Sequence, residues 1–452
     1  MLMGSTQSSK VRSSAALIQA GALLPFILVT SLFFLWGMPN NLNDVLIRQF
    51  MKSFEISRFQ AGLVQSAFYM GYFLLAAPAA LLMRRFGYKS GIVSGLILLG
   101  AGCILFWPAA MVGAYSYFLC ALFVIASGLS FLETAANPFV AQLGDPENAA
   151  RRLNFAQAFN PLGAITGALI GTRFIFSGIE LTRGQVASMQ AAHTYAAYLR
   201  AETLRVVTPY LVLGAAALLL AVVVGRVAFP PVAVESRMGT LGAPGKGGFR
   251  QLLNYPHFLL AIVAQFMYVG AQVGTWSYFI QYVQDAVHAP EKTAGYFLTG
   301  TLASFGVGRM VSSLLMRWIS PATLMGVYGL ANIALLAVGV AMPGWTGLWA
   351  IFLSSFFMSV MYPTIFALGV GGLGDNTKIG ASLIVMSIIG GAVLTPAMGI
   401  VSQTTGSIAV AYVVPLAGYI FVALYAFWGC RVKPVRGREA AGEPECAVEE
   451  LG

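Results

Sequence analysis

A glutamate lies in the middle of an apolar stretch, in the sequence GLSFLETAANP at residues 128–138. Only 16 of the 452 residues are acidic, and two of them lie well inside such stretches: Glu133 here and Asp44 in WGMPNNLNDVLI. At the centre of a membrane helix a charged side chain costs about 2.5–3.5 kcal/mol on insertion scales, so it faces a cavity or a partner. Removal from water also favours the neutral form of a carboxyl group. Both residues are therefore candidates for handling a proton or contacting a substrate.

Each carboxyl group has its own surroundings in the sequence. The alternative role for Glu133 is a structural ion pair with Arg309, which lies in the apolar stretch that contains GVGRM. Asp44 follows Pro39, which interrupts a helix, and has asparagines around it, among them Asn41. Because Asp44 is near the outer end of its stretch, we expect it to be partly solvated.

Amide side chains recur at intervals of three in NFAQAFNPLG, at Asn154, Gln157 and Asn160. This spacing places all three on one face of a helix. An amide both donates and accepts hydrogen bonds, which suits the hydroxyl groups of a sugar. The alternative is that these amides hydrogen-bond to neighbouring helices, as polar residues in membrane bundles do.

Aromatic and amide residues alternate along another stripe, in QFMYVGAQVGTWSYFIQY. Tyr268, Gln272 and Trp276 recur every four residues there. Aromatic rings beside an amide match a sugar, which has apolar C–H faces and polar edges. Tyrosine and tryptophan are also common at membrane interfaces, so a single ring is weak support for a binding role.

The elements that carry these residues are membrane helices. The chain is 58% hydrophobic and 9% charged, with a mean hydropathy of +0.78, whereas soluble domains have about 25% charged residues. A span needs about 20 mostly apolar residues. On this basis we predict an all-α membrane protein with twelve spans, at residues 21–47, 59–82, 90–110, 115–142, 152–177, 207–229, 256–284, 294–317, 322–342, 346–372, 379–402 and 408–430. The segment 177–205 is expected to be a polar outer loop.

The basic residues predict the orientation of the spans. With twelve spans both termini share one side, and that side holds 17 of the 26 Lys and Arg residues against seven on the other side. Cytoplasmic loops carry the excess of Lys and Arg, so we expect both termini in the cytoplasm. Arg84 and Arg85, in the RRFGYKS turn after the second span, contribute to this excess. Their alternative role is gating, by pairing with acidic residues at neighbouring helix ends.

The chain is predicted to consist of two six-helix bundles that resemble each other. NPFVAQLGDPENAARRLNFAQAFNPLG in the first half corresponds to YPTIFALGVGGLGDNTKIGASLIVMSIIGG in the second, and such weak internal symmetry is typical of transporters. Glu133 precedes Pro138 by five residues, whereas Met358 holds the equivalent place before Pro363. The carboxyl group therefore belongs to chemistry of the first half alone. The predicted parts are a tail at 1–20, a bundle at 21–229, a linker at 230–255, a bundle at 256–430 and a tail at 431–452.

Other function classes find little support in the sequence. The histidines have no spacing typical of metal ligands, and no phosphate-binding GxxxxGK loop is present, so we expect neither a metal site nor ATP-driven transport. We expect no enzyme activity and no cofactor apart from a coupling proton. The net charge of +10 arises from the gaps between spans, so no nucleic-acid partner is expected.

Several motifs together resemble one family. These are FFLWGMPNNLNDVL, GLSFLETAANPF, RRLNFAQAFNPLG, YVGAQVGTWSYFIQY, SVMYPTIFALG and VMSIIGGAVLTPAMG, which extend from about residue 20 to about residue 430. They resemble the L-fucose permease branch of the major facilitator superfamily, which also includes bacterial glucose/galactose carriers. NNLND and GAQVGTWS are more similar to the fucose carriers.

The resemblance implies a fold of two pseudo-symmetric bundles and proton-coupled sugar symport by a monomer in a bacterial inner membrane. It implies sugar binding and proton coupling for Asp44, protonation for Glu133, and a place in the polar cavity for Asn41, Gln157 and Asn160. The alternatives are a glucose/galactose-type carrier and a sugar sensor that does not transport. The short tail at 431–452 argues against a sensor.

Overall fold

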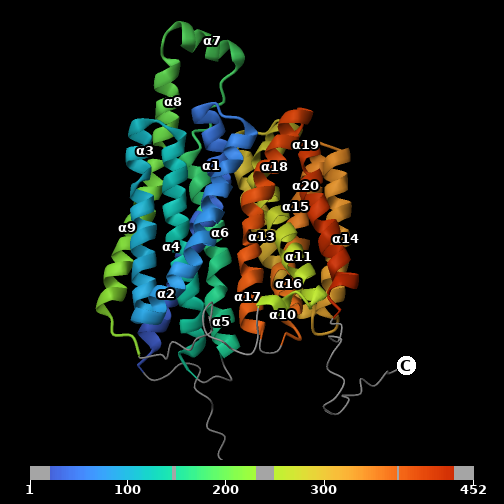
Figure 1. The fold of residues 1–452 in the computed structure, drawn as a ribbon. Coiled ribbons are helices and arrows are strands. Elements are labelled where there is room, and N and C mark those ends of the chain that lie inside the picture. Colours follow the sequence, from blue (N-terminus) through green and yellow to red (C-terminus); the bar gives the residue numbers. More distant parts are fainter. Residues whose placement is uncertain (1–20, 145–148, 231–248, 374–375, 432–452) are drawn as a thin grey trace, which may run out of the picture.

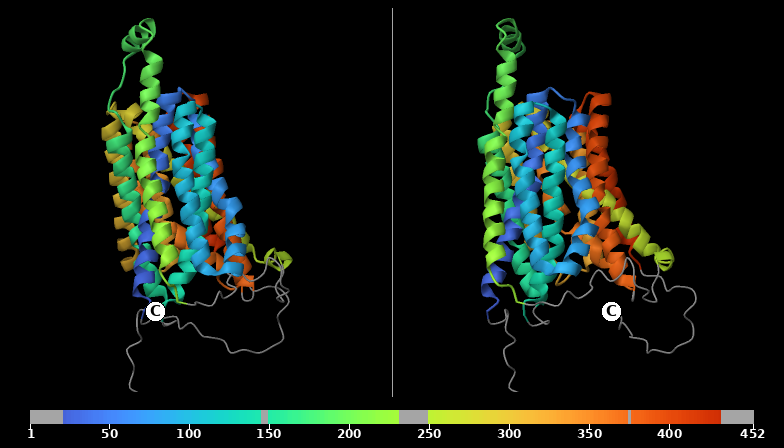
Figure 2. Two further views of the ribbon diagram at one scale, coloured as in Figure 1. Left: turned by 90° about the vertical axis from the view of Figure 1, so that its left-hand side faces the viewer. Right: turned by 60° about the vertical axis from the view of Figure 1, so that its left-hand side comes forward.

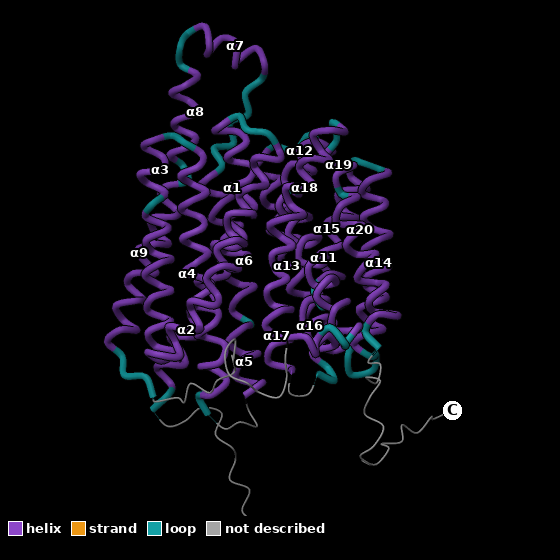
Figure 3. Tube along the Cα trace, viewed as in Figure 1, coloured by secondary structure: helices purple, strands orange, loops and turns teal. Residues whose placement is uncertain are grey.

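The computed structural model describes residues 21–144, 149–230, 249–373 and 376–431. Every regular element within these ranges is helical, and the helices make up most of the chain (Figure 3). The elements of the first half are α1 (Leu23–Phe54), α2 (Arg58–Ile104), α3 (Phe106–Val112), α4 (Tyr115–Gln142), α5 (Ala149–Gln157), α6 (Phe159–Ile170), η2 (Gly171–Ile175), α7 (Arg183–Ala191), α8 (Tyr195–Leu204) and α9 (Val207–Arg226).

The second half has a similar set of helices. Its elements are α10 (Phe249–Leu252), α11 (Pro256–Ser277), α12 (Phe279–Val287), α13 (Glu291–Leu315), α14 (Pro321–Ala341), α15 (Trp345–Met358), α16 (Met361–Val370), α17 (Thr377–Met386), η4 (Ser387–Ile389), α18 (Gly390–Thr405), α19 (Ile408–Ala411), α20 (Val413–Leu424) and η5 (Tyr425–Gly429). The predicted tail 1–20, nearly all of the predicted tail 431–452 and residues 231–248 of the predicted linker lie outside the described residues.

Ten helical stretches in the described residues are long and apolar enough to cross a membrane, and each overlaps a predicted span. The fifth predicted span is divided into α5, α6 and η2, none of which is long enough alone. The eighth is the continuous helix α13, which is rich in Gly, Ser and Thr. Both run alongside the other helices (Figure 1).

Prolines explain where two of the spans are interrupted, but the interruption expected at Pro39 was wrong, because α1 continues through it from Leu23 to Phe54. A proline has no backbone N–H, so the carbonyl four residues earlier loses its helical partner. Pro161 frees the carbonyl of Gln157, the residue at which α5 ends. Pro363 frees the carbonyl of Ser359, between α15 and α16, and this oxygen accepts a hydrogen bond of 3.4 Å from Nε of Arg309.

The helices of the two halves form two adjacent groups (Figures 1 and 2). We name the end at which α7 and α8 lie the α7 end, and the opposite end, where α5 and α10 lie, the α5 end. α1 begins and η5 ends at the α5 end (Figure 1). The turn predicted at RRFGYKS is present, since Gly87 adopts φ 81° and divides α2 into the second and third spans.

The expectation of a loop at 177–205 was wrong, because most of this segment is helical. α7 begins with a capping box in which Thr182 accepts a hydrogen bond from the N–H of Gln185, and the Gln185 side chain accepts one from the N–H of Thr182. α8 is rich in Ala and Leu, which are good helix formers. It leads directly into α9, so that Tyr195–Arg226 is one long helical stretch with a part apolar enough to cross a membrane.

The two groups meet mainly along two helix pairs, α2 with α18 and α6 with α13, and α1 also contacts α11. Glycines permit the close approach of α2 and α18. A Cβ atom at Gly62 would lie 3.0 Å from the Cα of Pro396 in α18, and one at Gly399 would lie 2.8 Å from the Cα of Phe59 in α2. Any larger side chain at these positions would force the helices apart.

Polar contacts between the groups concentrate at the α7 end. The Arg58 guanidinium donates a 2.7 Å hydrogen bond to Oγ of Ser402 and pairs with Asp285, and Tyr278 donates to the carbonyl of Arg58 at 2.7 Å. At the α5 end, in contrast, α5, α16 and α17 pack mainly on helices of their own half. The molecule is therefore closed at the α7 end and less tightly joined at the α5 end.

Candidate functional site

Asp44 lies where the two groups of helices meet. Its Oδ1 accepts hydrogen bonds from Nε2 of Gln65 in α2 and from Oγ of Ser277 in α11, both at 3.0 Å. Nε2 of Gln65 also donates to Oγ of Ser277 at 2.9 Å. Because α2 and α11 cover Asp44, its side chain is only 3% exposed, and the expectation of partial solvation was wrong.

Glu133 has different surroundings. Its side chain, in α4, is half-buried, and no described residue donates a hydrogen bond to its carboxylate or forms an ion pair with it. The alternative ion pair with Arg309 is not formed here. The Arg309 guanidinium bonds to the carbonyl of Ser359 and lies 5.0 Å from the ring centroid of Phe305. Met358, the equivalent of Glu133 in the second half, is fully buried.

Tyr69 of α2 links the surroundings of the two carboxyl groups. It lies within electrostatic range of both Asp44 and Glu133, and also of Tyr362 in α16. Its ring covers Gly391 of α18, where an added Cβ would meet the ring carbons at 2.8–3.2 Å. The ring thus fills part of the contact between α2 and α18.

The predicted amide positions make contacts between helices. Nε2 of Gln157 donates to Oδ1 of Asn137 at 3.0 Å, and Nδ2 of Asn137 donates to the backbone carbonyl of Glu133 at 3.1 Å. Nδ2 of Asn160 donates to the carbonyl of Phe33 in α1, at 3.4 Å. Asn41 is buried and donates to a carbonyl of its own helix. Gln157 is the exposed member of this set. The side chain of Asn154 lies outside the described residues.

The predicted aromatic stripe of α11 is anchored to α15. Oη of the fully buried Tyr268 donates to the carbonyl of Met358 at 2.9 Å, and Nε1 of the half-buried Trp276 donates to Oγ of Ser355 at 3.0 Å. The half-buried Gln272 has no hydrogen-bond partner among the described residues. Gln272 is thus the member of the stripe whose polar atoms are free for a ligand.

The arginines predicted as gating or anchoring residues show no gating contact in the described residues. Arg85 is exposed, and its guanidinium lies 5.2 Å from the ring centroid of Phe86. The side chain of Arg84 lies outside the description.

A charged cluster at the α7 end was missed by the sequence analysis. Nζ of Lys52 lies 3.1 Å from Oε1 of Glu291, which belongs to the second half, and 3.4 Å from Oε2 of Glu202. Glu291 is fully buried and also accepts a 2.8 Å hydrogen bond from the N–H of Gly178. Glu202 is buried and accepts a 3.0 Å bond from Nε2 of Gln49. We name Lys52, Glu202 and Glu291 the lysine cluster.

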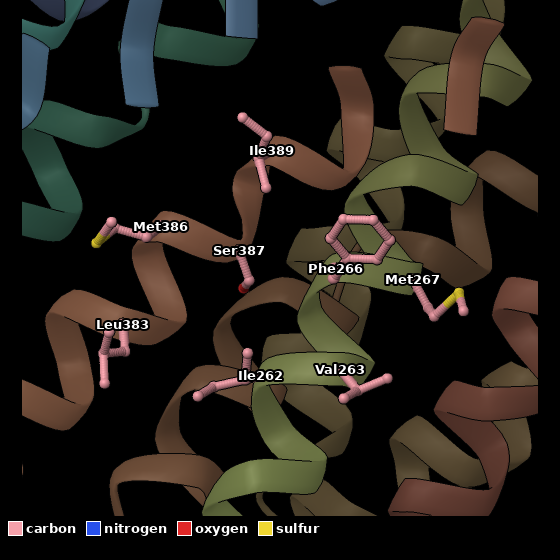
Figure 4. A pocket seen from close by; sticks show the side chains of 8 residues that line it. All are labelled: Ile262, Val263, Phe266, Met267, Leu383, Met386, Ser387 and Ile389. Atoms are coloured by element: carbon pink, nitrogen blue, oxygen red, sulfur yellow. The ribbon is translucent and has the colours of Figure 1, made fainter. Parts of the chain in front are cut away.

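Two cavities lie away from Asp44 and Glu133. A polar cavity of about 560 Å³ lies at the α7 end beside the lysine cluster, with Arg48, Glu55 and Tyr195 among its lining residues. An apolar cavity of about 450 Å³ lies between α11 and the α17–η4 segment (Figure 4). Ser387 is the one polar side chain that lines the apolar cavity, and its hydroxyl is already bonded to the carbonyl of Ile384. This cavity offers little to a sugar.

The residues that the sequence analysis missed differ in how clearly the sequence indicates a functional role for them. Gln65 is a polar residue inside an apolar span and could have been selected as Gln157 was. Ser277 is adjacent to Trp276, but a serine in a membrane helix is too common to indicate a site. Glu202 and Glu291 lie in predicted loops, where an acidic residue is expected to be solvated.

Comparison with known proteins agrees with this architecture. The model of the Major Facilitator Superfamily matches residues 26–378. The L-fucose-proton symporter of Escherichia coli (strain K12) is 41% identical over 424 residues, which cover 93% of this chain and 96% of the relative. The glucose/galactose transporter of Brucella abortus is 35% identical over 405 residues, 89% of this chain and 93% of the relative.

A solved structure extends the comparison to three dimensions. The crystal structure of the transporter FucP in the outward conformation matches with a TM-score of 0.66 at 41% identity, and covers 89% of this chain and 98% of that one. The helical spans, the family match and the near full-length similarity agree with one another. The chain is a multi-pass membrane protein that belongs to the major facilitator superfamily and, within it, to the family of proton-coupled L-fucose symporters.

Proposed function

We propose that this chain imports L-fucose, or a related hexose, together with protons by alternating access of its two bundles. The observation that carries the proposal is the position of Asp44: a carboxyl group buried in the membrane that hydrogen-bonds to the opposite bundle. A proton taken up by such a group changes both its charge and its contact with the other bundle. Proton binding and the movement of the bundles are thereby linked.

In this proposal the α7 end faces the outside and the α5 end faces the cytoplasm of a bacterium, so the described arrangement is the one open to the inside. The excess of basic residues in the gaps at the α5 end supports this orientation. Transport requires that the loaded and the empty carrier change sides while singly loaded forms do not. A charged, empty site supplies part of that barrier, because a bare carboxylate is costly within the membrane.

The proposed cycle begins with the bundles open at the α7 end. A proton neutralises Glu133 or Asp44, and a hexose then binds. The sugar hydroxyls bond to five polar side chains, and its apolar face lies against two rings. The five are Asn41, Asp44, Gln157, Asn160 and Gln272, and the rings are Tyr268 and Trp276. Because Tyr268 and Trp276 already donate to α15, their rings and not their polar atoms would face the sugar.

The substrate assignment rests on the fucose relatives, and the Brucella relative makes glucose and galactose the second candidates. The test is uptake of radiolabelled L-fucose by proteoliposomes in the presence of a tenfold excess of unlabelled L-fucose, D-glucose or D-galactose. Unlabelled L-fucose should abolish the signal and the other two should leave most of it. Inhibition by D-glucose or D-galactose equal to that by L-fucose would contradict the fucose assignment.

A further inference from the structure

We infer that Gln65 and Ser277 are positioning residues for proton release: their hydrogen bonds favour the carboxylate form of Asp44 while the bundles are closed at the α7 end. The inference rests on the proposed proton–sugar symport. It assigns a role in that cycle to two residues outside the predicted site.

The directions of the three hydrogen bonds follow from the donors available. The amide nitrogen of Gln65 carries two hydrogens, one for Oδ1 of Asp44 and one for Oγ of Ser277. The serine oxygen thus accepts from Gln65, and its own hydrogen is directed to Oδ1 of Asp44. Oδ1 therefore accepts two bonds, and it cannot carry a proton without losing one of them.

The surroundings make these two bonds important. Asp44, Gln65 and Ser277 are all buried, and no described Lys or Arg pairs with Asp44. Neutral donors are therefore the direct support of the carboxylate, and hydrogen bonds to the charged form favour it. Oδ2 of Asp44 has no donor among the described residues, so it is the oxygen from which a proton can leave.

Ser277 differs from Gln65 in the bundle to which it belongs. Gln65, like Asp44, is in the first half, whereas Ser277 is in α11 of the second half. When the α7 end opens, α11 moves away from α1 and Asp44 loses the serine donor. The serine donor is therefore present only when the α7 end is closed, where it offsets part of the cost of burying the carboxylate. This contribution favours proton release on the inside.

A nearby serine provides a matched control. Ser66, next to Gln65 on α2, also donates across the two bundles, to the carbonyl of Ala392 at 2.7 Å. This carbonyl lacks its helical donor because Pro396 stands four residues later. Ser66→Ala therefore removes a hydrogen bond between the bundles that does not involve a carboxylate.

The test compares net uptake with exchange in proteoliposomes that contain the full chain. Net uptake requires proton release and return of the empty carrier, whereas exchange of labelled for unlabelled L-fucose does not. For Ser277→Ala we expect kcat of net uptake to fall at least about tenfold, because the variant loses one hydrogen bond to a charged group. KM and the exchange rate should stay within about twofold of wild type. Ser277→Thr, which keeps the hydroxyl, should restore net uptake, and Ser66→Ala should leave it unchanged.

Each other outcome bears on the inference. Normal net uptake by Ser277→Ala, or an equal loss in Ser66→Ala, overturns it. If Ser277→Ala does not fold, Gln65→Met replaces it in the test, because methionine has a similar volume and removes the other donor to Asp44. Its net uptake should fall while its exchange rate stays near wild type. Wild-type protein that exchanges L-fucose but does not accumulate it under a proton gradient contradicts the proposed symport itself. Accumulation by wild type together with unaffected variants contradicts only this inference.

Discussion

Glu133 and Asp44 are both acids in a membrane, but their surroundings suit different tasks. Asp44 is enclosed by donors from two bundles, whereas the Glu133 carboxylate is half-buried without a donor among the described residues. Tyr69 lies within electrostatic range of both. In our account Glu133 is the group that an entering proton and sugar meet. Protonation of Asp44 changes its hydrogen bonding to the opposite bundle.

The role of Glu133 leads to a prediction at the residue scale. Glu133→Gln keeps the shape of the side chain and removes the titratable group, so proton-driven accumulation of L-fucose should be abolished while exchange continues. The measurement is the internal-to-external sugar ratio under an acid-outside gradient, beside exchange without a gradient. A variant that still concentrates the sugar would show that the proton binds elsewhere.

Sequence alone could identify the acids but not their partners. Placing a charged carboxylate in a membrane costs free energy, so an acidic residue in an apolar run indicates a functional role. Glu133 and Asp44 are identifiable in the sequence for this reason. Ser277 gives no comparable signal, since a serine hydroxyl is inexpensive to bury when it bonds to its own helix. Its importance depends on the close approach of α11 to α1, which composition does not reveal.

At the scale of elements, the closed α7 end depends on charge and on close packing. Lys52 lies between Glu202 of its own bundle and Glu291 of the other. Breaking a buried ion pair leaves an uncompensated charge and typically costs about 3–5 kcal/mol. The Lys52–Glu291 pair joins the two bundles and forms only when the α7 end is closed, so this pair favours the arrangement described here.

Glu291→Gln should therefore shift the molecule toward the arrangement open at the α7 end. With spin labels at Val112 of α3 and Thr405 of α18, in a chain with its native cysteines replaced, the population at longer distance should rise at least about tenfold. Glu55→Gln is the control, because Glu55 bonds to Tyr195 within the first half. Equal distance distributions in Glu291→Gln and wild type would contradict a role of the cluster in gating.

The glycine contact of α2 with α18 gives a second prediction for this end. A Cβ at Gly399 would meet Oη of Tyr278 at 2.6 Å and the carbonyl oxygen of Arg58 at 2.8 Å, so Gly399→Val should prevent closure. Exchange of L-fucose should fall at least about tenfold. Gly225→Val, at a position with no atom within 4 Å of an added Cβ, should leave exchange near wild type. Equal rates in both variants would mean that this contact is not needed for closure.

Most of the elements could be predicted, and the exceptions have physical causes. Ten spans follow from hydropathy because a membrane helix must be apolar along its length. The fifth span was predicted as continuous at residues 152–177, and its break follows from Pro161, which leaves the carbonyl of Gln157 without a helical donor. The helices α7 and α8 were missed because a polar segment between spans predicts a loop. α7 is polar but has a capping box, and α8 contains good helix formers and continues into α9.

At the scale of the whole molecule, the two bundles resemble each other in helices and differ in chemistry. The carboxyl groups of the site belong to the first half, while the second half supplies Ser277, Gln272 and the anchored aromatic rings. In the proposed function, a sugar between the bundles would meet acids on one side and rings on the other. Binding of sugar and of protons would then control a single movement.

Accumulation of L-fucose against its own gradient tests the central claim most directly. Purified protein in proteoliposomes should take up radiolabelled L-fucose above the external concentration when the outside is acidic, and only to equilibrium when the pH is equal on both sides. A protonophore should abolish the difference. If folded protein does not accumulate L-fucose under the gradient, or does so equally without one, proton-coupled fucose import by this chain is contradicted.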